Sequence, residues 1–218
     1  MTNYNNSLHI HGGQNFFLGQ YFADLLILPL ETITTNDKEN KDTKETNNID
    51  IIHENSCIKN MTVFPIDSDT TPLERNSHSL SIDKNHNVFY IFGGGYNKGL
   101  LNDLWSFDLN NNKWKQIMYT GAKIFPREMH GSAFFELDVE NKKTKFLYVF
   151  GGRSYEEPLD DMFSINLETN FSEKVGKLPR KLCSFSYISL NNFILIYGGT
   201  DVNEFVNDIF LFDITKKW

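Results

Sequence analysis

The chain has 218 residues, 40% of them hydrophobic and 14% aromatic, which is enough to bury a sizeable core. Its formal net charge of -7 argues against a nucleic-acid partner, because nucleic-acid surfaces need Lys and Arg to neutralise phosphates. The first residues are polar and none is basic, and the longest apolar run is short. We therefore predict neither a signal peptide nor a membrane span.

Two cysteines, Cys57 and Cys183, lie far apart in the sequence. Their spacing supports neither a disulfide framework nor a zinc site. Reduced thiols fit this pattern best, so we predict a cytoplasmic location.

An apolar stretch that runs into a double glycine occurs four times along the chain. Glycine adopts positive φ at little cost, so each pair predicts a sharp turn at the end of a strand. The apolar stretches begin at Leu8, Phe89, Leu147 and Ile194, and the glycines are Gly12, Gly13, Gly93, Gly94, Gly151, Gly152, Gly198 and Gly199. Repetition at this spacing is the signature of a repeat architecture.

Further residues recur in phase with the glycines. An aspartate follows the second glycine by nine positions in three copies, as Asp103, Asp161 and Asp208, and by eleven in the first, as Asp24. An aromatic residue closes three units, as Trp114, Phe171 and Trp218. Upstream elements read as Arg75-x-x-His78, Arg127-x-x-His130 and Arg180-x-x-Cys183. Each unit thus has four short β-prone segments separated by turn residues, as in one blade of a propeller.

The combined pattern resembles the kelch-repeat family over residues 8–31 and 75–218. The resemblance implies an all-β, kelch-type β-propeller whose loops bind another protein, as a scaffold or adaptor and not an enzyme, with no cofactor. Blades are predicted at 75–118, 127–174 and 180–218, with a partial first blade at 8–31 completed by the segment 57–64. The chain would then hold about three and a half four-stranded blades.

Residues 32–50 interrupt the first predicted blade. They are almost entirely Thr, Asn, Asp, Lys and Glu, a composition that cannot bury enough apolar surface to offset chain entropy. We predict a disordered insertion there. A longer loop adds only a few kcal/mol to the cost of closing it, so the fold can tolerate the insertion.

The predicted blade count is that of an incomplete propeller, since the resemblance implies about five to seven blades. Open blade edges at both ends favour self-association. One alternative is a fragment of a longer chain, in which the blades are the targeting part beside a catalytic domain such as a phosphatase. Another is a closed four-bladed ring.

Possible catalytic and metal-binding residues have simpler explanations. His9 and His11 share one face of a predicted strand, a spacing that metal sites use. They occupy positions that hold Tyr148 and Phe150 in another copy, so we interpret them as packing residues. The recurring Arg-x-x-His pairs are interpreted as structural for the same reason. We predict no catalytic residue and no metal ligand.

Candidate binding residues lie in the loops after the double glycines, because repeated strands position loops and loops carry function. The resemblance implies a partner contact by an Arg directly after the double glycine, a position held by Arg153. Arg and Tyr are enriched among interface hot spots. The predicted partner-binding residues are Arg153, Tyr155, Tyr96, Phe16, Phe17 and Asp201. The alternative for the two tyrosines is that they cover adjacent blade edges.

Overall fold

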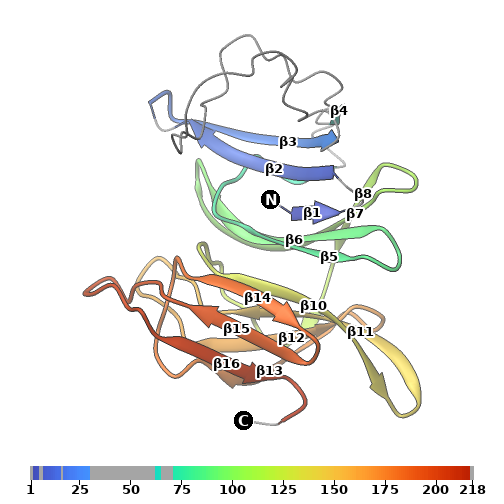
Figure 1. The fold of residues 1–218 in the computed structure, drawn as a ribbon. Coiled ribbons are helices and arrows are strands. Elements are labelled where there is room, and N and C mark those ends of the chain that lie inside the picture. Colours follow the sequence, from blue (N-terminus) through green and yellow to red (C-terminus); the bar gives the residue numbers. More distant parts are fainter. Residues whose placement is uncertain (1, 5–6, 16, 30–61, 65–70, 217–218) are drawn as a thin grey trace, which may run out of the picture. The chain divides into compact units, whose positions relative to one another are not determined.

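A computed structural model describes residues 2–4, 7–15, 17–29, 62–64 and 71–216. The chain divides into two compact units, Met1–His11 with Asp24–Pro65 and Gly12–Ala23 with Ile66–Trp218. The described residues form strands and turns without a helix. They build separate sheets of largely antiparallel strands, which confirms the all-β, kelch-type fold (Figure 1).

The first sheet has the order β1-β2-β3-β4. Its strands are β1 (Thr2–Tyr4), β2 (Ser7–Asn15), β3 (Gln20–Pro29) and β4 (Thr62–Phe64). Strand β1 precedes the double-glycine strand, where the sequence pattern predicted none. Strand β4 lies inside the predicted segment 57–64 and pairs with β3. The predicted insertion at 32–50 and Cys57 lie outside the described residues.

The second sheet has the order β5-β6-β7-β8 and the third β10-β11-β12-β13-β9. The second comprises β5 (Ser79–Asp83), β6 (Val88–Tyr96), β7 (Gly99–Asp108) and β8 (Lys113–Ile117). The third comprises β10 (Gly131–Val139), β11 (Lys142–Phe150), β12 (Asp161–Asn166), β13 (Phe171–Lys177) and the short β9 (Thr120–Gly121), which pairs parallel to β13.

The fourth sheet has three strands among the described residues, in the order β14-β15-β16. They are β14 (Ser186–Leu190), β15 (Phe193–Tyr197) and β16 (Ile209–Asp213). The first strands of the second, third and fourth sheets contact one another, β10 lying against both β5 and β14. Trp218, which was predicted to close the fourth unit, lies outside the described residues.

Successive sheets of the second unit pack face to face through apolar side chains. We call the side of a sheet that faces the next sheet along the chain its forward face, and the side that faces the preceding sheet its backward face. The forward face of the second sheet (Tyr90, Phe92, Leu104) meets the backward face of the third (Leu147, Val149, Phe163, Ile165) in one core cluster. The forward face of the third (Ala133, Tyr148, Phe150, Met162) meets the backward face of the fourth (Ile194, Ile196, Phe212) in another. This is the packing expected between propeller blades.

Several of the repeated glycines lie against a neighbouring chain segment. All eight have positive φ, as the turn out of each strand requires. A Cβ on Gly152 would stand 2.5 Å from the Cβ of His130 and 2.6 Å from the carbonyl oxygen of Glu128. Both the backbone conformation and the contact therefore require glycine at this position.

A buried arginine explains why an aspartate follows the double glycine in the second and third sheets. Arg127 is fully buried, and its two terminal nitrogens donate to the Asp161 carboxylate at 2.6 and 3.1 Å. It also donates to the carbonyl oxygens of Gly151 and Phe125. Arg75 makes the same contacts with Asp103 and Gly93 in the second sheet. The arginine therefore connects the glycine turn to the next strand in the second and third sheets.

The fourth unit departs from this arrangement, and its predicted register needs a correction of two residues. The Gly152 amide donates to the Leu182 carbonyl oxygen, as the Gly94 amide donates to that of Arg127. Leu182 and Phe185 thus hold the positions of Arg127 and His130, whereas Arg180 and Cys183 were predicted to do so. The backbone hydrogen bonds, and not the residue types, set this register.

His130 lies in the core between the second and third sheets, where its Nε2 is 2.8 Å from the Ser79 hydroxyl. Desolvation, aided by the nearby Arg127 guanidinium, lowers the pKa of His130 to about 3. The imidazole therefore stays neutral in the folded protein at pH values where the unfolded chain takes up a proton.

Stability should fall as the pH drops below 6.5, the ordinary pKa of histidine. Because unfolding binds one extra proton there, His130 should cost up to about 1.4 kcal/mol of unfolding free energy per pH unit. His130→Phe, which introduces the residue that Phe185 supplies at this position in the fourth unit, should make the fall shallower in urea titrations between pH 7 and about pH 4. Equal slopes for the two proteins would contradict this assignment.

Candidate functional site

The loops that follow the double glycines in the second unit lie near one another, and we call them together the loop face. They comprise residues 14–19, 95–99, 153–160 and 200–207. Gln14 accepts a hydrogen bond from the Asn76 side chain at 2.5 Å, and the backbones of Asn76 and Gly95 bond to each other. Hydrogen bonds therefore tie these loops to the segments that begin the sheets.

Arg153 begins the loop after the third double glycine. Its backbone pairs with that of Glu128, and its Nε lies 3.1 Å from the Glu128 carboxylate. The side chain remains 46% exposed. Because the ion pair uses Nε, the two terminal nitrogens can still donate to a carboxylate from outside. Glu128 thus holds the arginine in place without covering it.

Tyr155 bridges two neighbouring sheets. Its hydroxyl accepts a hydrogen bond from the Leu100 backbone amide at 2.5 Å, in the hairpin of the second sheet. Most of the ring is exposed. Further along the same loop, Glu157 forms an ion pair with Lys181, which precedes the fourth sheet. The loop is therefore anchored on both sides, and Tyr155 both covers the adjacent blade edge and presents an open ring surface.

Asp201 organises the loop of the fourth sheet. Arg180 lies 2.6 Å from its carboxylate and 2.7 Å from that of Glu204, and this pairing lowers the pKa of Asp201. Asp201 also accepts hydrogen bonds from the backbone amides of Asn203 and Glu204. Its side chain is thus committed to the loop's own structure.

The same loop presents two exposed apolar side chains that the sequence analysis did not single out. Val202 has a φ of 81°, which is strained for a β-branched residue. Phe205 is almost fully exposed. Together they give the loop face an apolar area beside its charged groups. Strained backbone conformations of this kind cluster at binding sites.

The other predicted binding residues lie on the first and second loops. Tyr96 lines a cavity of about 440 Å³ with Ala23, Leu73 and Lys98, separate from a cavity of about 370 Å³ beside Asp201. Phe17 is exposed at the tip of its loop. Phe16 lies outside the described residues. The structure thus places Arg153, Tyr155 and Asp201 on neighbouring loops. Tyr96 pairs with Gly99 in the hairpin that Tyr155 contacts, whereas Phe17 lies on the first loop.

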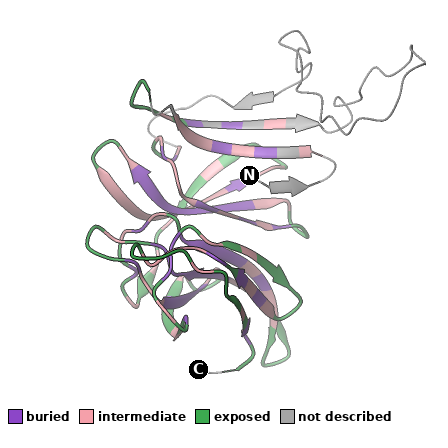
Figure 2. Ribbon diagram, turned by 60° about the vertical axis from the view of Figure 1, so that its left-hand side comes forward, coloured by how far each residue is buried: buried purple, intermediate pink, exposed green. Residues whose placement is uncertain are grey.

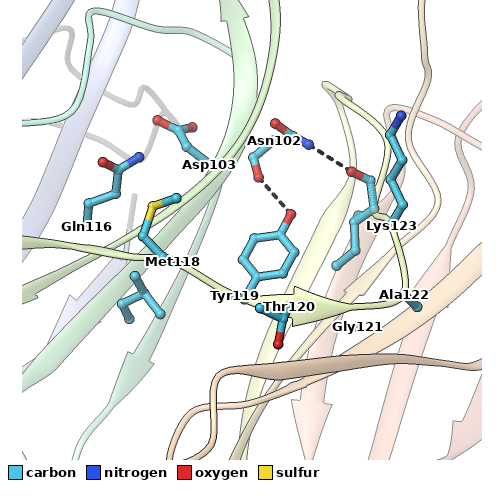
Figure 3. A pocket seen from close by; sticks show the side chains of 11 residues that line it. Asn102, Asp103, Gln116, Met118, Tyr119, Thr120, Gly121, Ala122 and Lys123 are labelled. Atoms are coloured by element: carbon cyan, nitrogen blue, oxygen red, sulfur yellow. Dashed lines mark hydrogen bonds between the residues drawn. The ribbon is translucent and has the colours of Figure 1, made fainter.

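A further cavity, of about 390 Å³, lies where the chain passes from the second to the third sheet (Figure 3). Polar groups that line this cavity form hydrogen bonds with one another. The Tyr119 hydroxyl donates to the Asn102 carbonyl oxygen, and the Asn102 amide donates to that of Ile124. Burial raises the pKa of Tyr119 to about 12, so the phenol remains protonated near neutral pH. These groups brace the connection and offer no acid–base pair.

Three further observations bear on chemistry. Among the described side chains, no group of three or more His, Cys, Asp and Glu converges as a metal site would require. Burial raises the pKa of the Cys183 thiol, the opposite of what activates a nucleophilic cysteine. Within residues 71–216 and the shorter described segments before them, no helix has the length and apolar character to cross a membrane.

Face-to-face sheets, positive-φ double glycines and arginine–aspartate pairs define a kelch-type propeller module. The family model for the KLHDC2/KLHL20/DRC7 Kelch-repeats domain matches residues 1–136 and, in an overlapping match, 39–218. The chain therefore belongs to this family. Membership suggests a protein-interaction module.

The chain is similar to several longer proteins. It is 29% identical over 156 residues to Kelch repeat-containing protein 2 of Saccharomyces cerevisiae, covering 66% of this chain and 17% of that protein. It is 25% identical over 161 residues to Leucine-zipper-like transcriptional regulator 1 homolog of Drosophila melanogaster, covering 68% and 16%. A third, Acyl-CoA-binding domain-containing protein 5 of Arabidopsis thaliana, is 28% identical over 134 residues, covering 60% and 19%. The chain thus spans less than a fifth of these relatives.

Proposed function

We propose that this chain is a protein-interaction scaffold that holds a partner protein on the loop face, in the cytoplasm. The observation that carries the proposal is the third loop, in which Tyr155 and Glu157 are anchored to opposite neighbours while Arg153 stays half exposed. A fixed loop loses little conformational entropy on binding, so its exposed side chains can contribute their full contact energy.

The exposed groups suggest what a partner should offer. Arg153 can make a bidentate bond to a carboxylate. Tyr155 and Phe205 provide apolar contact area on the neighbouring loops. We therefore propose a partner segment that combines an acidic side chain or a terminal carboxylate with an apolar side chain close by. Asp201 acts in this scheme by holding its loop in shape.

Replacing the exposed groups should release the partner without unfolding the chain. In affinity capture from a lysate followed by mass spectrometry, Arg153→Ala combined with Tyr155→Ala should lose at least tenfold of a specific partner. Lys143→Ala is the matched control, because Lys143 is an exposed basic residue paired with Asp138 on the β10–β11 hairpin. Circular dichroism checks that each variant is folded. Full retention of every partner by the double variant would refute the loop-face proposal.

The chain covers less than a fifth of each of these longer relatives. This favours a second candidate, in which the blades are the recognition part of a larger protein that carries its own activity. The predicted phosphatase arrangement belongs to this class. An antibody against residues 127–174 would distinguish the two candidates on a blot of cell extract. A band near 25.3 kDa would support the first candidate, a scaffold made of this chain by itself. A much larger band would support the second candidate, a multidomain protein.

A further inference from the structure

A groove of about 850 Å³ lies between the outer part of the second sheet and the turn that joins β12 to β13 in the third. Both sheets belong to the second compact unit. The groove is at the opposite end of the strands from the loop face, since β7 runs from Gly99 in the loop face to Asp108 in the groove. Its outer side is β8, in which three of five residues are exposed (exposed residues are green in Figure 2).

The inner side of the groove is apolar. Val88, Ile117 and Leu167 line it, and each is only partly buried where it packs against the core cluster between the two sheets. Apolar surface in a groove with polar surroundings is typical of a protein contact site.

Two lysines stand on the outer side of the groove. Leu104 lies on the forward face of the second sheet and pairs with Ile117, which therefore lies on the same face. Since alternate residues of a strand share a face, Lys115 and Lys113 lie there too. Both lysines are exposed and both line the groove. They form a row with Ile117 along β8.

The acidic residues of the groove are committed to other contacts. Asp108, opposite Lys113, accepts hydrogen bonds within the β7–β8 turn. Glu168 forms an ion pair with Lys142. Within the part of the chain that the structure describes, neither Lys113 nor Lys115 has an ion-pair partner. The groove therefore presents two open cations on a chain whose formal net charge is -7, and a ligand of complementary charge is acidic.

The blade structure itself does not require these lysines. In the third sheet, the strand pairings place Phe171 and Glu173 at the positions of Lys113 and Lys115. The third sheet thus forms the same strands with an aromatic and an acidic residue there. The basic row is a property of this one groove and not of the repeat.

We propose that the groove binds an extended segment of a partner protein, distinct from the partner on the loop face. The segment carries two acidic side chains two positions apart and an apolar side chain two positions further. An extended chain advances by about 6.6 Å every two residues, so the acidic side chains match Lys113 and Lys115 while the apolar one meets Ile117. The proposal is independent of the loop face, because it rests on other residues.

Fluorescence anisotropy with a labelled peptide tests the proposal on the intact chain. The peptide Leu-Thr-Asp-Thr-Asp-Thr-Leu presents the pattern in either direction along β8. It should bind the unmodified chain, with an affinity that falls as the salt concentration rises. Lys113→Glu combined with Lys115→Glu should weaken binding by about tenfold or more. Lys143→Glu, at an exposed lysine on the β10–β11 hairpin, should leave the affinity unchanged. Circular dichroism checks the fold of each variant.

Two further peptides make the test specific. A peptide with lysine in place of both aspartates should bind the double variant and not the unmodified chain, which loss of folding could not produce. A peptide of the same composition with adjacent aspartates, Leu-Thr-Thr-Asp-Asp-Thr-Leu, should bind the unmodified chain more weakly. Equal binding of the two acidic peptides would overturn the proposal, since the lysines would then attract any anion. Equal affinity of the double variant and the unmodified chain for the first peptide would overturn it as well.

Discussion

Arg127→Met should lower the free energy of unfolding by about 3–5 kcal/mol, because it removes one partner of a buried ion pair. Arg127 is fully buried and bonds through both terminal nitrogens to Asp161. Methionine fills a similar volume but leaves the carboxylate without its cation and two backbone carbonyl oxygens without a donor. Urea denaturation followed by tryptophan fluorescence measures the change.

Two controls separate loss of the pair from loss of packing. Adding Asp161→Leu to Arg127→Met should recover much of the stability, because an apolar pair avoids the isolated charge. Arg180→Met should cost less than about 1 kcal/mol, because Arg180 is partly exposed and its ion pairs are solvated. A loss below about 1 kcal/mol for Arg127→Met would show that the repeated arginine does not stabilise the blade.

Gly152→Ala should cost about 2–5 kcal/mol, from a strained positive φ and from overlap with the neighbouring segment. The added Cβ would meet the backbone carbonyl oxygen of Glu128, which cannot move without shifting the hydrogen bonds between Glu128 and Arg153. The same urea titration measures this change. The substitution should also loosen Arg153, which follows directly in the chain.

Gly19→Ala is the matched control for the cost of placing alanine at a positive φ. Gly19 has a φ of 63°, and a Cβ there would have no atom within 4 Å. It should therefore show only the strain of a positive φ, about 1–2 kcal/mol. Equal losses in the two variants would mean that the close approach at Gly152 contributes nothing.

The fold class could be predicted because its signals are local and repeated. The double glycines, the aspartates and the apolar stretches each recur with nearly constant spacing, and each has a local physical cause. Strands β1 and β9 could not be predicted, since they span only three and two residues. Such segments are strands because of their neighbours and not because of their own sequence.

The register error at Arg180 has a similar origin. An arginine stood at nearly the expected place, and the pattern gave it the role of Arg127. The backbone hydrogen bonds instead place Leu182 there, so the fourth unit lacks the buried arginine and Arg180 pairs with its loop. Residue type alone could not distinguish these two arrangements.

The sequence could predict the candidate site only as a set of loops. Its individual contacts join residues that are distant in sequence, such as Leu100 with Tyr155 and Glu128 with Arg153. Whether an exposed Arg or Tyr is held for binding or committed to its neighbours depends on these contacts. Val202 and Phe205 were missed because single apolar residues in a polar loop carry no repeated signal.

Hydrogen–deuterium exchange of the chain with its captured partner tests the loop-face proposal most directly. Backbone amides in 95–99, 153–160 and 200–207 should exchange more slowly in the complex, because a bound partner excludes water from them. Strand β8 and the Phe171 end of β13, which pairs with Asn166, lie away from these loops and should exchange as in the free chain. Protection of β8 or β13 with no change in the three loops would contradict the account.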